Sequence, residues 1–247
     1  MNDAHPAGDF GLLDVQVARK AYRTAAGASL EVLRDVAFSL RAGEVGALVG
    51  PSGCGKTTML RIIAGLDHDY DGNVRRPADG RLGMVFQEPR LLPWRTVDEN
   101  VRLVAPQADA QELTSLFDVL ELAAHRAHYP GELSLGLARR VALARAFAVK
   151  PELLLLDEPF VSLDNALAAR LREELATLVE RRAVTTLLVT HDMDEAVGLA
   201  DRVFLLSPRP ARMLAEVPIR APRAARSRDD RASIKADIAT RLAGAAR

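Results

Sequence analysis

The chain has 247 residues, of which 49 % are hydrophobic, so it can bury one sizeable core without disulfides or structural metals. Its 33 basic and 33 acidic side chains cancel, which argues against a nucleic-acid partner or a strongly anionic surface. It has one cysteine, no apolar signal segment at its start and no apolar run approaching roughly 18 residues, so we expect a cytoplasmic protein without a membrane span.

The chain begins with two segments in which apolar and polar residues alternate. These are residues 12–18 (LLDVQVA) and 29–40 (SLEVLRDVAFSL), separated by the small and polar stretch 23–27. Such alternation predicts antiparallel strands. After Glu44 the pattern changes to an apolar strand, VGALV, a glycine-rich turn and the helical segment TTMLRIIAGL, which together predict half of an α/β unit.

The rest of the chain alternates between strands and helices, with one helical interruption. A strand is expected at residues 82–86, and residues 89–150 carry helical periodicity that predicts an inserted helical subdomain. The strands expected after it are LLLLD, TTLLVT and RVFLL, and the helices expected between them cover residues 165–182 and 192–200. Residues 220–247 predict one surface helix with a solvated basic face, joined by a loose linker.

The sequence GPSGCGKT, between the first apolar strand and its helix, matches the phosphate-binding loop GxxxxGK[ST]. Glycines let the backbone curl so that its N–H groups face phosphate oxygens, and the helix that follows presents its positive end to the same anion. Lys56 can then reach the β- and γ-phosphates, and Thr57 can offer its hydroxyl to Mg²⁺. The residues expected to contact ATP here are Gly50, Pro51, Ser52, Gly53, Cys54, Gly55, Lys56, Thr57 and Thr58. Cys54 is interpreted as a small filler residue rather than a redox group.

Polar residues follow three further predicted strands. Asp157 and Glu158 end the strand LLLLD, at the edge where open α/β sheets bind ligands. Asp157 is placed to hold Mg²⁺ and Glu158 to polarise the attacking water, although a solvated acidic turn is the alternative. His191 can contact the γ-phosphate and the water, but a lone histidine after a strand is more often structural. Gln87 can likewise monitor Mg²⁺ and the γ-phosphate.

In chain order, the motifs GPSGCGKT, FQEP, ELSLGLARRVALARA, LLLLDEP, SLD and VTHD resemble those of ABC transporter ATPase subunits across nearly the whole chain. The resemblance implies an α/β fold, a P-loop NTPase core of the ABC ATPase type with an N-terminal antiparallel β-subdomain and an inserted α-helical subdomain. One ABC ATPase domain is then expected over residues 1–247. Its ATP-binding core would comprise about residues 10–88 and 151–218, its helical subdomain 89–150 and its tail 219–247.

The same resemblance assigns further roles. In the family, the segment matching residues 133–137 binds the γ-phosphate of the nucleotide held by the other subunit, which places Ser134 and Gly136 at a second ATP and implies a head-to-tail dimer. Tyr22 would stack on adenine, although a tyrosine at a strand end can equally be ordinary packing. Gln87 would sense the transmembrane partner and Asp164 would link the two sites.

The signature segment departs from the family pattern, because LSLGL stands where LSGGQ is usual. A side chain at Leu135 restricts backbone conformations that glycine allows, and Leu137 removes an amide near the nucleotide. We expect slower or more tightly coupled turnover rather than a lost site. Ser162 replaces the alanine that is common at its position, a milder change.

Residues 86–101 (FQEPRLLPWRTVDENV) and 205–213 (LLSPRPARM) are similar to the ATPase subunits of bacterial nitrate, sulfonate, taurine and bicarbonate importers. This implies transmembrane permease partners, a periplasmic solute-binding protein and a peripheral place at the cytoplasmic face of the inner membrane. Two alternatives stay open. One is a nucleotide-gated scaffold that binds ATP without hydrolysing it. The other is a non-transport ABC ATPase acting on nucleic acid or ribosomes, against which the neutral charge and the short chain argue.

Overall fold

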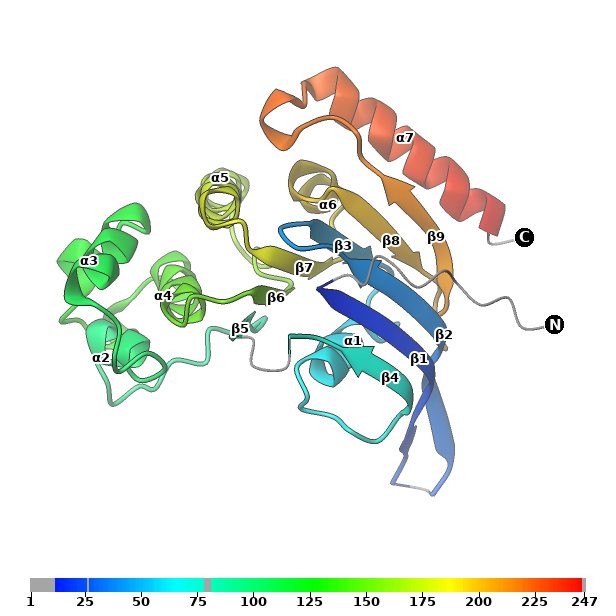
Figure 1. The fold of residues 1–247 in the computed structure, drawn as a ribbon, viewed down its shortest axis with the longest axis horizontal. Coiled ribbons are helices and arrows are strands. Elements are labelled where there is room, and N and C mark those ends of the chain that lie inside the picture. The colour runs from blue at the N-terminus through cyan, green and yellow to red at the C-terminus, as the bar shows by residue number, and fades with distance from the viewer. Residues whose placement is uncertain (1–11, 26, 78–80, 246–247) are drawn as a thin grey trace.

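The computed structural model describes residues 12–25, 27–77 and 81–245, which form two sheets with helices around them (Figure 1). The larger sheet has the strand order β5-β6-β7-β3-β8-β9, and only β9 runs antiparallel to its neighbour. Its strands are β3 (Val45–Val49), β5 (Leu82–Val85), β6 (Leu153–Asp157), β7 (Thr185–Thr190), β8 (Arg202–Leu206) and β9 (Met213–Pro218). The smaller sheet is antiparallel, with β1 (Leu13–Arg23) between β2 (Ser29–Leu40) and β4 (Asp71–Arg75).

The central strands β3, β6 and β7 are buried along their whole length because both of their faces are covered. In β3, Ala47 packs into a core shared with helices, whereas its neighbour Leu48 packs into a second core. The second core also contains Val15 of β1 and Phe38 of β2. The antiparallel sheet together with helix α1 (Lys56–Ile63) therefore covers one face of the larger sheet and further helices cover the other, which confirms the predicted fold class.

Three helices lie together at one side of the molecule, away from the antiparallel sheet (Figure 1). They are α2 (Val97–Arg102), α3 (Ala110–Val119) and α4 (Leu135–Ala148), with short 3₁₀ turns at Ala123–His125 and Pro130–Glu132. The remaining helices are α1 (Lys56–Ile63), α5 (Asn165–Arg182), α6 (Met193–Leu199) and α7 (Arg228–Ala245), and a 3₁₀ turn covers Arg223–Ala225. None of the helices in the described residues is long and apolar enough to span a bilayer.

Two strands were not predicted from the sequence. The segment of β4 is short and polar, so it carries no alternating pattern, and it forms an edge strand by pairing with β1. Its Gly72 has φ 137°, and a Cβ there would lie 2.1 Å from the carbonyl oxygen of Gln16, so only glycine fits. Strand β9 pairs with β8 across a tight loop and closes the sheet at its far edge.

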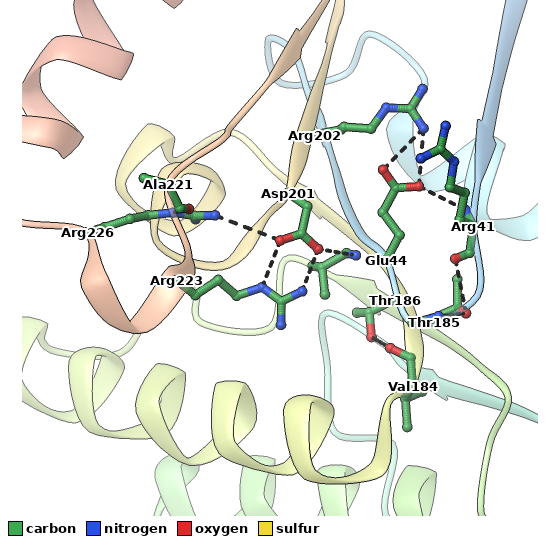
Figure 2. Close-up of polar contacts among 12 residues, drawn as sticks. Arg41, Glu44, Val184, Thr185, Thr186, Asp201, Arg202, Ala221, Arg223 and Arg226 are labelled. Atoms are coloured by element: carbon green, nitrogen blue, oxygen red, sulfur yellow. Dashed lines mark hydrogen bonds and ion pairs between the residues drawn. The ribbon is translucent and has the colours of Figure 1, made fainter.

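The expectation of a loose linker before the tail helix is wrong. Arg223 donates to both carboxylate oxygens of Asp201, at 3.2 Å and 2.5 Å (Figure 2). The Arg226 side chain is fully buried and donates to the carbonyls of Ala221 and Val197. The expected solvated basic face is therefore wrong for Arg226, and Ile238 of α7 is also fully buried, so the tail packs onto the domain.

Candidate nucleotide site

The candidate site lies at the carboxyl edge of the larger sheet, where four adjacent strands end. In spatial order these strands are β5, β6, β7 and β3. Gln87 follows β5, and Asp157 and Glu158 lie at the end of β6. His191 follows β7, and the phosphate loop of residues 50–57 follows β3. Because parallel neighbours end at the same edge, groups that are a hundred or more residues apart in the chain meet there.

The phosphate loop requires its glycines for two different reasons. Gly53 and Gly55 have φ values of 73° and 130°, which side chains rarely adopt. A Cβ on Gly55 would also lie 2.8 Å from Leu33 and 2.9 Å from Val32, because β2 packs directly against the loop. The Lys56 side chain is buried within the loop, and its Nζ donates to the carbonyl oxygen of Gly50 at 2.8 Å.

The neighbouring strand brings two acids to this lysine and its helix. The Thr57 hydroxyl donates to Asp157 Oδ1 at 3.1 Å, which joins the start of α1 to the end of β6. Glu158 Oε1 lies 3.7 Å from Lys56 Nζ, and its Oε2 lies 3.2 Å from His191 Nδ1. Glu158 thus lies between the lysine of the phosphate loop and the histidine after β7.

The two acids have different surroundings. Asp157 is 3 % exposed, and burial raises the pKa of its carboxyl group. Within the described part of the chain its carboxylate accepts a side-chain hydrogen bond from Thr57 alone, so a nearby cation would offset the cost of its buried charge. Glu158 is partly exposed at the mouth of the site, where it can meet both water and the phosphate loop.

Backbone contacts fix the direction of Glu158. It has φ 45°, an uncommon conformation for a non-glycine residue, and its N–H donates to the Val189 carbonyl of β7 at 2.9 Å. The segment that follows is held from α4, because Arg139 donates to the carbonyls of Pro159 at 2.7 Å and Val161 at 2.5 Å. Sequence reasoning missed Arg139, although an arginine pair, Arg139 and Arg140, at the start of a largely apolar helical stretch is an available signal.

A buried acid, Glu195, contacts the segment around His191 through Thr190. The Thr190 hydroxyl donates to Glu195 Oε2 at 2.5 Å and accepts a bond from the Asp192 N–H at 2.9 Å. Burial raises the pKa of Glu195, which lies on α6. Asp164, for which a linking role was predicted, caps α5 by accepting from the Leu167 N–H at 2.9 Å.

The signature segment forms the start of α4. The Ser134 hydroxyl caps this helix by accepting from the Leu137 N–H at 3.3 Å. Gly136 is buried against α5, where a Cβ would meet Leu167 at 2.6 Å, and Leu135 points outward with 44 % of its surface exposed. Among the described hydrogen bonds, none joins this segment to the phosphate loop of the same chain.

Tyr22 lies on β1, and Gln87 follows β5. The Tyr22 hydroxyl donates to Asp67 Oδ2 at 2.8 Å, and Lys20 Nζ lies 4.4 Å from the centre of the tyrosine ring. Lys20 also donates to Asp67, so the ring is held from two sides while 36 % of Tyr22 is exposed. Gln87 is exposed just beyond β5. The adenine contact of Tyr22 and the sensing role of Gln87 stay predictions.

The fold and this arrangement define a phosphate-loop ATPase, with the loop, the paired acids and the histidine at the ends of three adjacent strands, β3, β6 and β7. A family model described as "ABC transporter" matches residues 33–161. The chain belongs to the ABC transporter family and is an ATP-hydrolysing subunit of it.

Curated relatives extend the match to most of the chain. It is 44 % identical over 208 residues to the aliphatic sulfonates import ATP-binding protein SsuB 2 of Pseudomonas syringae pv. tomato, covering 84 % of this chain and 87 % of the relative. It is 42 % identical over 249 residues to the protein of the same name from Burkholderia lata, covering 97 % and 88 %.

Solved structures agree with this assignment. The dimeric post-hydrolysis state of the ATP-binding cassette MJ0796 bound to ADP and Pi has a TM-score of 0.72 and 28 % sequence identity. A second dimeric structure of that bacterial ABC transporter cassette gives a TM-score of 0.74. Both comparisons cover 85 % of this chain and 100 % of the solved chain.

Proposed function

We propose that this chain is the motor subunit of an ABC importer for aliphatic sulfonates or similar small organosulfur anions. The observation that carries the proposal is the position of Glu158 between Lys56 and His191 at the mouth of a phosphate loop. The solute class rests on the similarity to the aliphatic sulfonates import ATP-binding proteins described above.

In this proposal the chain holds ATP through the loop residues and Lys56, which turns from its carbonyl partners to the β- and γ-phosphates. Glu158 accepts a hydrogen bond from the attacking water and orients it, and His191 contacts the γ-phosphate from the next strand. Tyr22 stacks on the adenine.

A Mg²⁺ ion fits the proposed site because Thr57 and Asp157 offer a hydroxyl and a buried carboxylate within 3.1 Å of each other. These oxygen donors suit magnesium, and Gln87 would contribute another from the end of β5. When bound, the ion neutralises charge on the phosphates. No group of three histidine, cysteine or acidic side chains suited to a metal occurs among the described residues, so phosphate and water oxygens would complete its shell.

The proposed motor is a head-to-tail dimer. In this proposal Ser134, which is exposed at the start of α4, and the backbone of Gly136 in the first turn contact the nucleotide of a second copy. The dimeric cassettes described above support this assembly. On the helical side, Trp94 is 70 % exposed and Tyr129 is 49 % exposed, which suits docking to a permease at the inner face of the membrane. A periplasmic solute-binding protein would deliver the solute.

The test is steady-state release of phosphate from Mg-ATP by the purified chain at increasing protein concentration, with Glu158→Gln as the variant. We expect activity that rises more steeply than concentration, because the site needs two copies, and loss of activity in the variant with ATP binding retained. Binding without release by the wild-type chain, alone and with its permease, would instead favour the nucleotide-gated scaffold. Uptake of a labelled alkanesulfonate by reconstituted transporter tests the solute class.

A further inference from the structure

A loop far along the chain contacts the tip of the phosphate loop. Arg209 lies in the turn between β8 and β9, and its Nη2 donates to the carbonyl oxygen of Gly53 at 2.5 Å. The two residues are separated by 156 positions in the sequence. None of the roles proposed above for the nucleotide site uses this arginine.

The turn that carries Arg209 is tied down at both sides. Ala211 is fully buried, its N–H donates to the Val32 carbonyl at 2.8 Å, and its carbonyl accepts from the Arg34 N–H at 2.9 Å. Within the turn, the Ser207 hydroxyl accepts from the Arg212 N–H at 2.9 Å. Since Val32 also packs against Gly55, β2 holds both the phosphate loop and the turn that bears Arg209.

The contacted carbonyl belongs to a peptide unit that is constrained at its other end. The Cys54 N–H donates to the Pro51 carbonyl at 3.2 Å and closes a four-residue turn at the tip of the loop. Gly53, the third residue of this turn, has φ 73°, the left-handed value that a type II turn requires there. In a trans peptide the carbonyl and N–H point in opposite directions, so Arg209 and Pro51 hold the two ends of one peptide plane.

We propose that Arg209 is a positioning residue for the phosphate loop. The Arg209 guanidinium binds the Gly53 carbonyl on the side away from the phosphates. This hydrogen bond holds the tip of the loop in the conformation in which backbone N–H groups, rather than a carbonyl oxygen, face the phosphates. Because Gly53 has no Cβ to restrict its backbone, the contact from Arg209 adds a second restraint on this peptide beside the hydrogen bond between Cys54 and Pro51. The inference rests on the nucleotide site proposed above.

The test measures the Kd of a fluorescent ATP and a fluorescent ADP for wild type and Arg209→Ala. Loop N–H groups cradle the α- and β-phosphates that both nucleotides carry, so both Kd values should rise by the same factor. Loss of one hydrogen bond predicts a rise of about three- to tenfold. At saturating Mg-ATP the kcat should stay near that of wild type, and Arg209→Lys should recover part of the affinity because it keeps a charged donor.

The matched control is Arg212→Ala, which removes an exposed arginine from the same turn and changes the net charge equally. It should bind both nucleotides as wild type does. Thermal unfolding of each variant is recorded in parallel. An Arg209→Ala protein that melts like wild type and shows the paired loss of affinity supports the positioning role.

Four results would overturn the inference. They are wild-type affinity in Arg209→Ala, loss of ATP affinity alone, equal losses in Arg209→Ala and Arg212→Ala, and an affinity loss matched by a lower melting temperature without recovery in Arg209→Lys. Loss of ATP affinity alone would mean that the guanidinium touches the γ-phosphate. A wild-type chain that binds ATP no better than Lys56→Ala would instead refute the proposed nucleotide site itself, and the inference with it.

Discussion

Replacing Asp201 with alanine should destabilise the domain by releasing its tail. Asp201 precedes β8, and its Oδ2 accepts from the Val45 N–H at 2.9 Å and from Arg223 at 2.5 Å. Its Oδ1 lies 3.8 Å from Nη2 of Arg226, an atom that has no hydrogen-bond partner among the described residues (Figure 2). One carboxylate therefore joins the start of β3 to the segment before α7.

The expected loss of folding stability follows from the groups that Asp201→Ala leaves without a partner. Breaking a buried ion pair costs about 3–5 kcal/mol because one charge stays buried alone, and an unsatisfied backbone N–H costs about 1–3 kcal/mol. The Arg226 side chain is 0 % exposed, but the Asp201 side chain is 35 % exposed, so water can replace part of the lost interaction. We therefore expect a total loss of about 3 kcal/mol, which lowers the Tm by roughly 6–12 °C in a chain of this size.

The assay is urea unfolding followed by circular dichroism, with thermal unfolding alongside it. The matched control is Asp237→Ala, which removes an acid from the exposed side of α7, where it pairs with Arg241 at 3.0 Å. That surface pair should contribute no more than about 0.5 kcal/mol. A loss below about 1 kcal/mol in Asp201→Ala would refute the view that this carboxylate anchors the tail.

Three further changes test other parts of the molecule. Leu135→Gly removes the exposed side chain at the start of α4 and restores the usual glycine of the signature. The ATPase rate of this variant at saturating ATP should rise about threefold, which corresponds to a barrier lower by roughly 0.6 kcal/mol. An unchanged rate would show that leucine at this position does not slow ATP hydrolysis. Arg139→Gln cannot span its two carbonyl partners, so kcat should fall several-fold while KM for ATP changes little; a rise in KM alone would contradict this reasoning. Ile238→Ala empties a fully buried position of α7 and should cost about 2–4 kcal/mol in urea unfolding; a loss under about 0.5 kcal/mol would mean that α7 is not part of the core.

The phosphate loop and the acids of β6 are recognisable in the sequence because their chemistry depends on neighbours in the chain. Glycine spacing sets the shape of the loop, and an apolar run that ends in Asp157 and Glu158 places these acids at a strand end. The α/β class follows from the alternation of such strands with amphipathic helices. The edge strand β4 was not predicted because its five residues, of which only Val74 is a large apolar one, are ordered by pairing with β1 rather than by a pattern of their own.

The sequence by itself determined the fold class, the family and the identity of the phosphate loop, because each is encoded by local spacing and periodicity. Only the tertiary structure decided which strand ends meet, and so brought Glu158 between Lys56 and His191. It alone revealed the contact of Arg209 with the loop and the anchoring of the tail on Asp201. The physical reason is that these contacts join residues distant in the chain, and no local pattern records which distant groups a folded sheet brings within hydrogen-bonding distance.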